Sequence, residues 1–338
     1  MKSYNHLFPD IYDFKNLHLA YLKARRNKRY RREVLAFSAN LEENLIDIQN
    51  HLIWKTYRTG KYHFFEIYEP KKRLVAALPF ADRVVHHALC NVIEPIFDAS
   101  FIYDSYACRQ GKGVLAGVNR TTKILREAEH KWGEVYCLKC DVKKYFPSID
   151  HEILRRIIRK KIACWDTLWL IDEIIDSTGG TNDLPIGNLT SQLWANVYLN
   201  ELDHYIKELL RTKYYVRYMD DWIILHHDKK YLHGLQEEIA SFLDSRLKLK
   251  FNAKTQIFPV RSRGIDFLGY RIWPEYRLLR KTNIKRMGRR LRKLQGLWSR
   301  REIKLEEIHI RIMSWLGHCK HADTYRLRNK MLDEFLLE

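Results

Sequence analysis

The sequence predicts an α+β fold. Two short β-rich runs, residues 214–218 and 222–225, flank a tight turn and therefore form an antiparallel hairpin. Residues 14–58 and the segment from Arg280 onward carry apolar residues at helical spacing among many charges. Strands that pair through a turn, mixed with helices of this length, favour an α+β fold over a doubly wound parallel sheet.

The N-terminal part of the chain is predicted to contain helices followed by a hairpin. Leucine and isoleucine recur within residues 14–58 at spacings that place them on one helix face. Residues 61–78 consist of a β-rich run, a basic turn and a second β-rich run, which predicts a hairpin with a cationic tip. Residues 82–97 are predicted to form a helix with Asp82 as its N-cap.

Strands and helices are also predicted in the remainder of the chain. They are a strand at 135–141 that ends at an acid, a helix from His151, helices at 189–210 and 238–249, and a strand at 264–273. The segment after Arg280 is predicted to be helical and very basic.

The chain is strongly basic. It has 60 Lys and Arg residues against 41 Asp and Glu, a formal net charge of +19, and 46% of its residues are hydrophobic. The apolar content excludes a disordered chain, and the charge indicates a protein that binds a polyanion. The positive charge gathers at residues 23–32, 71–73 and 280–301. We therefore predict a basic channel whose binding to nucleic acid weakens steeply with salt.

Several classes of protein are excluded. No run approaches the ~20 apolar residues of a membrane span, and the first residues lack the apolar core of a signal peptide. Six cysteines do not indicate a disulfide scaffold, and the lone pair Cys137 and Cys140 is interpreted as two buried strand residues. The histidines form no coherent four-ligand zinc set. We expect a cytoplasmic protein without membrane contact.

Acidic residues stand where two predicted strands end. Asp141 closes the strand at 135–141, and Asp220 and Asp221 lie at the turn of the hairpin. Neighbouring carboxylates repel one another unless a cation lies between them, and three of them can hold two Mg²⁺ ions for phosphoryl transfer. An Asp–Asp pair is also common in ordinary turns. The apolar strands on both sides and the basic chain favour the metal site.

These residues resemble a known family. Tyr218-Met219-Asp220-Asp221 is similar to the palm signature of reverse transcriptases, and residues 138–150 (LKCDVKKYFPSID) resemble the acid motif that precedes it. Other blocks resemble the fingers, palm and thumb of group-II-intron-like reverse transcriptases, namely residues 70–73, 82–88, 105–113, 249–255, 264–269 and 311–322. The resemblance runs from about Tyr62 to the C-terminus.

A right-hand polymerase fold is implied by this resemblance, with fingers, a palm with an antiparallel sheet, and a helical thumb. The implied parts are a basic helical N-terminal segment at 1–60, fingers at 61–130, a palm at 131–275 with finger-side helices inserted at 151–190, and a thumb at 276–338.

One block departs from most reverse transcriptases, which carry Gln-Gly-x-x-x-Ser-Pro between the acid motifs. This chain has Ile186-Gly187 and Ser191-Gln192 there, a pattern similar to that of diversity-generating retroelement reverse transcriptases. The resemblance implies error-prone, adenine-mutagenic cDNA synthesis from a template-repeat RNA, encoded by a bacterium, archaeon or phage. It also implies several partners, namely dNTPs, template RNA, an RNA–cDNA duplex and a basic accessory variability protein. The accessory protein of this family assembles as an oligomeric ring. An isoleucine cannot hydrogen-bond to brace the incoming nucleotide, so discrimination should fall.

The resemblance also implies roles for single residues. Asp141, Asp220 and Asp221 are the catalytic acids and hold two Mg²⁺ ions, with Mn²⁺ as a substitute and the Val142 carbonyl as an extra ligand. The implied nucleotide-binding residues are Lys71, Arg73, Phe146, Ile186, Gly187, Gln192 and Lys254. The residues implied to contact template or primer are Arg109, Lys112, Tyr218 and Met219.

Physical reasons support these roles, and each has a plainer alternative. Lys71 and Arg73 could clamp triphosphate, or could belong to an ordinary charged turn. Phe146 lies where a steric gate against a 2′-OH is expected, but a core aromatic would also suit the position. Lys254 is a candidate proton donor to pyrophosphate, although such a lysine is more often solvated. At Gly187 the backbone would have to approach the ligand closely.

Other functions remain open from the sequence. A group-II-intron-like, retron or phage-defence reverse transcriptase is the nearest alternative, although an intron-encoded protein usually continues into further domains. An inactive RNA-binding scaffold is the alternative of a different class, and the three clustered acids disfavour it.

Overall fold

The computed structural model describes residues 2–68 and 72–337, and its chain divides into two compact units. Unit 1 contains Met1–Tyr103, Asp141–Arg211 and Glu237–Lys254, and unit 2 contains Asp104–Cys140, Thr212–Gln236 and Thr255–Glu338. The predicted role of Lys71 lies outside the described residues.

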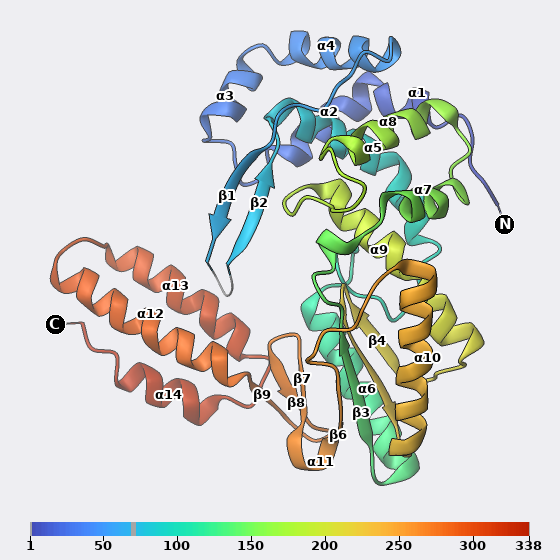
Figure 1. Cartoon of the computed structure of the whole chain (residues 1–338). Coiled ribbons are helices and arrows are strands. Elements are labelled where there is room, and N and C mark those ends of the chain that lie inside the picture. The colour runs from blue at the N-terminus through green and yellow to red at the C-terminus, as the bar shows by residue number, and fades with distance from the viewer. Residues whose placement is uncertain (1, 69–71, 338) are drawn as a thin grey trace. The chain divides into compact units, whose positions relative to one another are not determined.

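Unit 1 is mainly helical and carries one hairpin (Figure 1). Its helices are α1 (Phe8–Tyr12), α2 (Phe14–Ala24), α3 (Arg32–Ala39), α4 (Leu41–Ile53), α5 (Phe80–Asp98), α7 (His151–Arg159), α8 (Trp165–Asp176) and α9 (Leu189–His204). A 3₁₀ turn (Phe146–Ser148) precedes α7, and a π turn (Tyr205–Leu209) follows α9. Helix α10 (Lys229–Leu247) begins in unit 2 and ends in unit 1.

Helix α5 lies at the centre of unit 1. One side of it packs against α2 and α3, where the rings of Tyr21 and Phe37 meet Phe80 edge-on. The other side packs against α9, where Phe97 meets Trp194 edge-on. Because buried aromatic rings supply much of the apolar area removed from water, these contacts hold the helices together.

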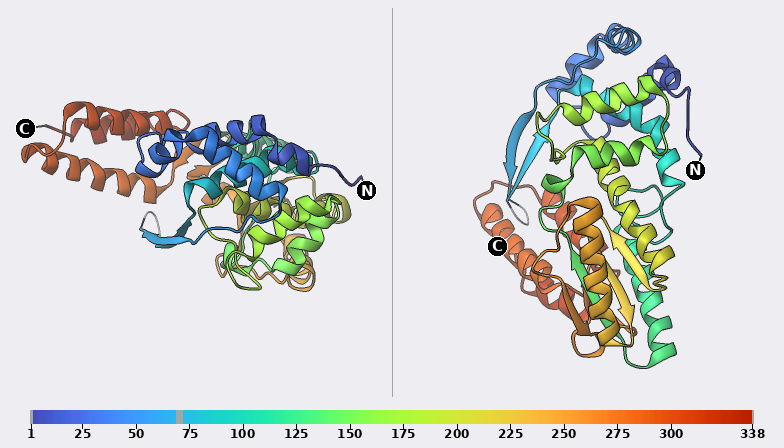
Figure 2. Two further views of the ribbon diagram at one scale, coloured as in Figure 1. Left: turned by 90° about the horizontal axis from the view of Figure 1, so that it is seen from above. Right: turned by 45° about the vertical axis from the view of Figure 1, so that its right-hand side comes forward.

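The hairpin of strands β1 (His63–Ile67) and β2 (Arg73–Ala77) extends from the helices of unit 1, in register with Phe65 opposite Val75. Both views of Figure 2 show this hairpin projecting beyond them. All five residues of β1 are exposed.

Unit 2 is built on a sheet with the strand order β4-β5-β3-β6. The strands are β3 (Tyr136–Asp141), β4 (Tyr215–Tyr218), β5 (Asp221–His226) and β6 (Gln256–Pro259), and β4–β5 and β3–β6 pair antiparallel. Helix α6 (Val114–Trp132) covers one face of this sheet, with Val118 and Leu125 in the same core as Val216 and Ile223.

A second sheet and three helices complete unit 2. Strands β7 (Ile265–Phe267), β8 (Tyr270–Ile272) and β9 (Arg277–Leu279) follow the short helix α11 (Val260–Arg263). Helices α12 (Lys281–Ser299), α13 (Leu305–Cys319) and α14 (Tyr325–Asp333) then lie side by side, as both views of Figure 2 show. A small core of Leu294, Ile303 and Ile308 joins α12 to α13.

Most predicted elements are confirmed, but Asp82 is not a helix cap. Helix α5 begins earlier, at Phe80 after Pro79. Asp82 is buried in the first turn, where the Tyr57 hydroxyl donates to it at 2.7 Å and the Gly60 N–H at 3.2 Å. The residue therefore ties the segment before β1 to α5, a long-range role that local pattern cannot reveal.

Two other boundaries differ from the prediction. The single strand expected at 264–273 is two strands, because Leu268 and Gly269 adopt left-handed backbone (φ 53° and 90°) and reverse the chain. Helix α10 begins at Lys229 rather than at 238. Among the described residues, no helix is long and apolar enough to cross a membrane.

The buried His86 gives a test of this packing. Burial lowers the pKa of its imidazole from 6.5 to about 3, and its Nδ1 lies 3.0 Å from the Thr190 hydroxyl. The unfolded chain takes up a proton below about pH 6.5 while the folded chain does not, so stability is full above that pH and falls as the pH drops toward 3. We expect wild type to lose about 1 kcal/mol of unfolding free energy relative to His86→Asn between pH 7 and pH 5.5. Urea unfolding at both pH values measures this, and parallel losses in the two proteins would contradict it.

Candidate active site

The β4–β5 turn carries two of the predicted catalytic acids. Tyr218 pairs with Asp221 across the ladder, so Met219 and Asp220 form the turn itself. Met219 has a φ of 55°, a left-handed conformation that costs a residue with a side chain about 1–3 kcal/mol. The surrounding structure must therefore hold this turn in place.

Arg217 supports the turn from within the protein. Its side chain is fully buried, and its Nη1 donates to the Met219 carbonyl oxygen at 3.0 Å. The backbone of Arg217 is held as well, since its N–H donates to Asp104 and its carbonyl accepts from Tyr106. Arg217 was not among the predicted site residues. An arginine inside an otherwise apolar strand was the signal that could have identified it.

Lys139 contacts the second acid of the turn. Its ammonium lies 2.8 Å and 3.0 Å from the two carboxylate oxygens of Asp221, and the two side chains are only 16% and 28% exposed. This cation offsets the repulsion between the neighbouring carboxylates of Asp220 and Asp221. Lys139 and Asp141 are two residues apart on β3, so their side chains leave the same face of the sheet. Lys139 was also missed, because its partner lies 82 positions away.

The segment after Asp141 is anchored within unit 1. The Asp141 carbonyl accepts from the Asn252 N–H at 2.7 Å, and the Lys143 N–H donates to the Lys250 carbonyl at 2.9 Å. Between them, the buried Val142 forms an antiparallel bridge with Phe251. The backbone on which the predicted acid and the predicted carbonyl ligand lie is therefore fixed.

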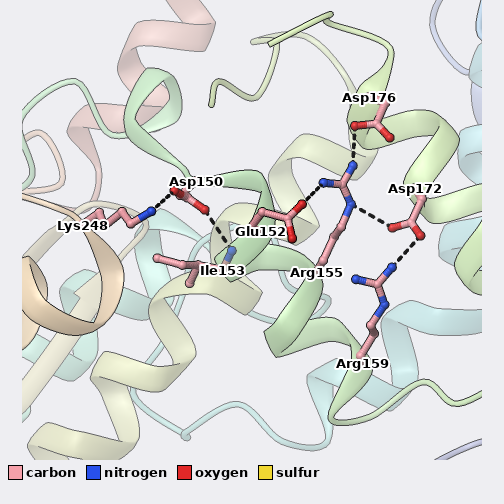
Figure 3. A network of polar contacts seen from close by, with 8 residues as sticks. All are labelled: Asp150, Glu152, Ile153, Arg155, Arg159, Asp172, Asp176 and Lys248. Atoms are coloured by element: carbon pink, nitrogen blue, oxygen red, sulfur yellow. Dashed lines mark hydrogen bonds and ion pairs between the residues drawn. The ribbon is translucent and has the colours of Figure 1, made fainter. Parts of the chain in front are cut away.

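An ion pair braces the same segment (Figure 3). Lys248 contacts Asp150 at 2.6 Å, and Asp150 also accepts from the Ile153 N–H at 3.0 Å as the N-cap of α7. Burial opposes ionisation of Asp150, but Lys248 and the helix N–H outweigh it and lower the pKa of the carboxyl. The ion pair thus joins the end of α10 to the start of α7.

Two predicted nucleotide-binding residues, Ile186 and Gly187, lie against strand β2 in unit 1. The Ala76 N–H of β2 donates to the Ile186 carbonyl at 2.8 Å. Gly187 has a φ of 130°, and a Cβ there would lie 2.7 Å from the Ala76 carbonyl oxygen. The approach of β2 therefore requires glycine at this position, and the predicted approach of Gly187 to a nucleotide stays a prediction. Arg73 is the first residue of that strand and is exposed.

The other predicted nucleotide-binding residues are more scattered along unit 1. Phe146 is half-buried, edge-on to Tyr145 at 5.7 Å, so its side chain is not fully enclosed in the core. Gln192 is exposed on α9. Lys254 is also exposed, and its backbone N–H donates to Asn252.

The residues predicted to contact template or primer gather around β4. Arg109 donates to the Ser105 carbonyl at 3.0 Å, and the Lys112 ammonium lies 4.8 Å from the Tyr106 ring centroid. Since the Tyr106 N–H donates to Arg217, this loop lies beside the strand that ends in Tyr218. Burial raises the pKa of Tyr218, which is half-buried.

The donor chemistry fits a hard divalent cation. Asp141, Asp220 and Asp221 are partly exposed carboxylates at strand ends, and Mg²⁺ prefers such oxygen ligands. Within the part of the chain that the structure describes, no group of three or more His, Cys, Asp or Glu side chains forms a ready-made metal site. The two ions therefore stay a prediction.

Replacing Lys139 tests whether its positive charge and a divalent ion can substitute for each other beside Asp221. Lys139→Met removes the ammonium that contacts both carboxylate oxygens of Asp221, so we expect the melting temperature in EDTA to fall by about 2–5 °C. Added Mn²⁺ should then stabilise the variant more than wild type, because the ion restores the missing charge. Lys143→Met, which removes an exposed lysine nearby, is the control. Equal Mn²⁺-induced shifts in wild type and Lys139→Met would show that Lys139 and the ion act independently.

Comparison with known proteins identifies the family. The family model described as reverse transcriptase (RNA-dependent DNA polymerase) matches residues 67–272, more than half of the chain. Protein YkfC of Escherichia coli is 25% identical over 235 residues, covering 56% of this chain and 60% of YkfC. The group II intron-encoded protein LtrA of Lactococcus lactis is 23% identical over 289 residues, covering 65% of this chain and 47% of LtrA. The chain thus spans between about half and three-fifths of the length of these relatives.

A solved structure shares the fold. Apo telomerase from Candida tropicalis, truncated from its C-terminal domain, aligns with a TM-score of 0.52 and 12% identity, over 67% of this chain and 55% of that one. At this identity the match shows fold alone, and the fold is the right-hand polymerase fold that the sequence predicts. With its antiparallel Tyr218–Asp221 hairpin and a family match over residues 67–272, the chain belongs to the reverse transcriptase family.

Proposed function

We propose that this chain is an RNA-dependent DNA polymerase. The observation that carries the proposal is the β4–β5 turn, in which a strained Met219 presents two adjacent acids and a buried arginine holds the turn. Only a turn fixed in this way keeps ligands within the narrow geometry that catalysis by metal ions requires. An inactive RNA-binding scaffold has no need of such strain.

In the proposed reaction, the primer 3′-hydroxyl oxygen attacks the α-phosphorus of a dNTP. The α–β phosphoanhydride bond breaks, pyrophosphate leaves, and the hydroxyl proton passes to water. Asp141, Asp220 and Asp221, with the Val142 carbonyl, would hold two Mg²⁺ ions. When bound, these ions supply charge stabilisation to the attacking and leaving oxygens.

The remaining predicted residues receive roles in the same proposal. Arg73, with Lys71, binds the triphosphate through its guanidinium fork. Ile186, Gly187 and Gln192 line the nucleotide pocket, Phe146 excludes a 2′-hydroxyl, and Lys254 donates a proton to pyrophosphate. The residues that contact template or primer are Arg109, Lys112, Tyr218 and Met219. Residues 61–130, 131–275 and 276–338 then act as fingers, palm and thumb.

We further propose that the enzyme belongs to a diversity-generating retroelement. The Ile186-Gly187 and Ser191-Gln192 pairs support this subclass, and a basic accessory variability protein and a template-repeat RNA would be its partners. Similarity to LtrA, named as a group II intron-encoded protein, supports a group-II-like enzyme as the second candidate.

Primer extension on an RNA template tests the polymerase. With Mg²⁺ and four dNTPs, wild type should extend an annealed DNA primer to the end of the template. A variant with Asp220→Ala and Asp221→Ala should not. Equal incorporation by both proteins, or none by wild type, would refute the activity.

Sequencing of the cDNA tests the subclass. We expect wild-type misincorporation to concentrate at template adenines and to fall severalfold in Ile186→Gln, because a glutamine amide at position 186 can hydrogen-bond and brace the nucleotide. Leu184→Ile, a change of apolar shape two residues away, is the control. Uniformly faithful wild-type cDNA would favour the group-II-like candidate instead.

A further inference from the structure

A pocket lies between α7, α9 and α10 in unit 1, apart from every residue assigned above to catalysis, nucleotide or primer. Its volume is about 390 Å³. Its lining includes the buried Leu247, the half-buried Phe242 and four charged side chains. The charged lining residues are Arg156, Lys160, Glu201 and Arg246. We call this feature the α7–α10 pocket.

The two faces of α7 differ in how their cations are neutralised. Arg155 contacts Glu152, Asp172 and Asp176, and Arg159 contacts Asp172, as Figure 3 shows. These two arginines, four residues apart, therefore join α7 to α8 through ion pairs. Arg156 and Lys160 are also four residues apart and line the pocket instead.

The lining of the pocket carries excess positive charge. Lys160 contacts Glu201 at 2.7 Å, which neutralises one cation. Arg156 and Arg246 make no hydrogen bond or ion pair within the described part of the chain, and both are exposed. Two guanidinium groups, one from α7 and one from α10, thus line one pocket without an ion-pair partner among the described residues, whereas the other two arginines of α7 are paired with acids. A guanidinium pair of this kind suits phosphate oxygens, which it can bind through paired N–H donors.

The rest of the pocket suits a nucleobase. Phe242 is half-buried and stacks on Tyr205 with ring centroids 4.2 Å apart, so its orientation is fixed. The other apolar lining residues, Ile153, Ile157 and Leu247, are aliphatic. Aromatic and aliphatic surface flanked by phosphate-binding cations is how proteins bind single-stranded nucleic acid without reading its sequence.

We propose that the α7–α10 pocket binds a nucleotide within a single-stranded RNA segment, outside the polymerase site. Its phosphates contact Arg156 and Arg246, and its base packs against Phe242. The inference rests on the proposed function in one respect, namely that RNA is the polyanion that this chain copies. The pocket would then tether the unpaired part of the template while the duplex part is extended.

Fluorescence anisotropy with the full chain tests this tether. One probe is a blunt RNA–DNA hybrid, and two others carry a 15-nucleotide single-stranded RNA extension at one or the other end. A single-stranded RNA overhang at one of the two ends should increase the affinity of wild type for the hybrid about tenfold near 0.1 M salt. The variant Arg156→Gln with Arg246→Gln should lose most of that gain and bind the blunt hybrid as wild type does. For the probe with the overhang, the slope of log affinity against log salt concentration should be about 1.4 shallower in this variant than in wild type. Two phosphate contacts to a single strand are lost, at about 0.7 each.

Matched controls keep the test decisive. Lys229→Gln with Lys230→Gln removes two exposed cations from the other end of α10 and should keep the full gain. Both arginines are exposed, so the variant should melt like wild type. An equal gain in wild type and the arginine variant would overturn the proposal. So would UMP binding at the arginines without any gain from the extension, because the pocket would then take free nucleotides.

Failure of the polymerase proposal looks different. In that case wild type would not extend a DNA primer annealed to a longer RNA template. Failure of the tether would leave that primer extension intact and would remove only the affinity gained from the single-stranded segment.

Discussion

Replacing Asp141 by asparagine is expected to lower the rate of nucleotide incorporation by about a thousandfold, equivalent to ~4 kcal/mol of transition-state stabilisation. The substitution keeps the shape of the side chain but removes the negative charge that would hold a divalent ion. The backbone should not move, because the Asp141 carbonyl is held by Asn252 and the next residue is paired with Phe251. The measurement is single-turnover primer extension on an RNA template at saturating dNTP.

The control for this effect is Asp244→Asn, which removes an exposed carboxylate from α10 and should leave the rate within twofold. The affinity for the RNA–DNA hybrid and the melting temperature should be close to wild type in both variants. A rate within tenfold of wild type for Asp141→Asn would remove Asp141 from the catalytic set. A parallel loss of rate and of melting temperature would instead indicate a damaged fold.

Replacing the buried Arg217 by methionine is expected to weaken both stability and catalysis. Methionine can fill the apolar space of the side chain, but it leaves the Met219 carbonyl without the donor now 3.0 Å away. A buried acceptor that loses its partner costs about 1–3 kcal/mol, and the left-handed turn loses its brace. We therefore expect the unfolding free energy to fall by roughly 2–3 kcal/mol and the incorporation rate to fall more than tenfold.

Urea unfolding and primer extension separate these two effects. Arg261→Met, which removes an exposed arginine from α11, should change neither quantity by more than a small amount. Hybrid affinity should also be nearly unchanged in Arg217→Met, since the buried side chain cannot reach the ligand. An unchanged rate together with lower stability would mean that the turn keeps its shape without Arg217.

The main elements of this fold were accessible from local pattern. The β4–β5 hairpin followed from two β-rich runs around a polar turn, and helix α7 followed from Asp150 ahead of an apolar repeat. These features depend on residues within one or two turns of each other, where side-chain spacing and capping decide the conformation. For the same reason the family motifs can be recognised in the sequence alone.

The roles of residues that depend on neighbours distant in the sequence could not be predicted from local pattern. Asp82 looked like a helix cap but is bound by Tyr57, 25 positions away, and Gly187 is required by the backbone of Ala76. The strand expected at 264–273 is two strands that meet at Leu268 and Gly269. The prediction missed this turn, because nothing in the sequence marks a left-handed conformation at a leucine.

The predicted acids therefore came from the sequence, and their supporting residues came from the tertiary structure. The order and type of Asp141, Asp220 and Asp221 are properties of short motifs. The identity of the cations beside the turn, Lys139 on Asp221 and Arg217 on Met219, depends on which strands pair and which face is buried. Charge neutralisation inside a protein acts through space over a few ångströms, so a linear pattern could not assign it.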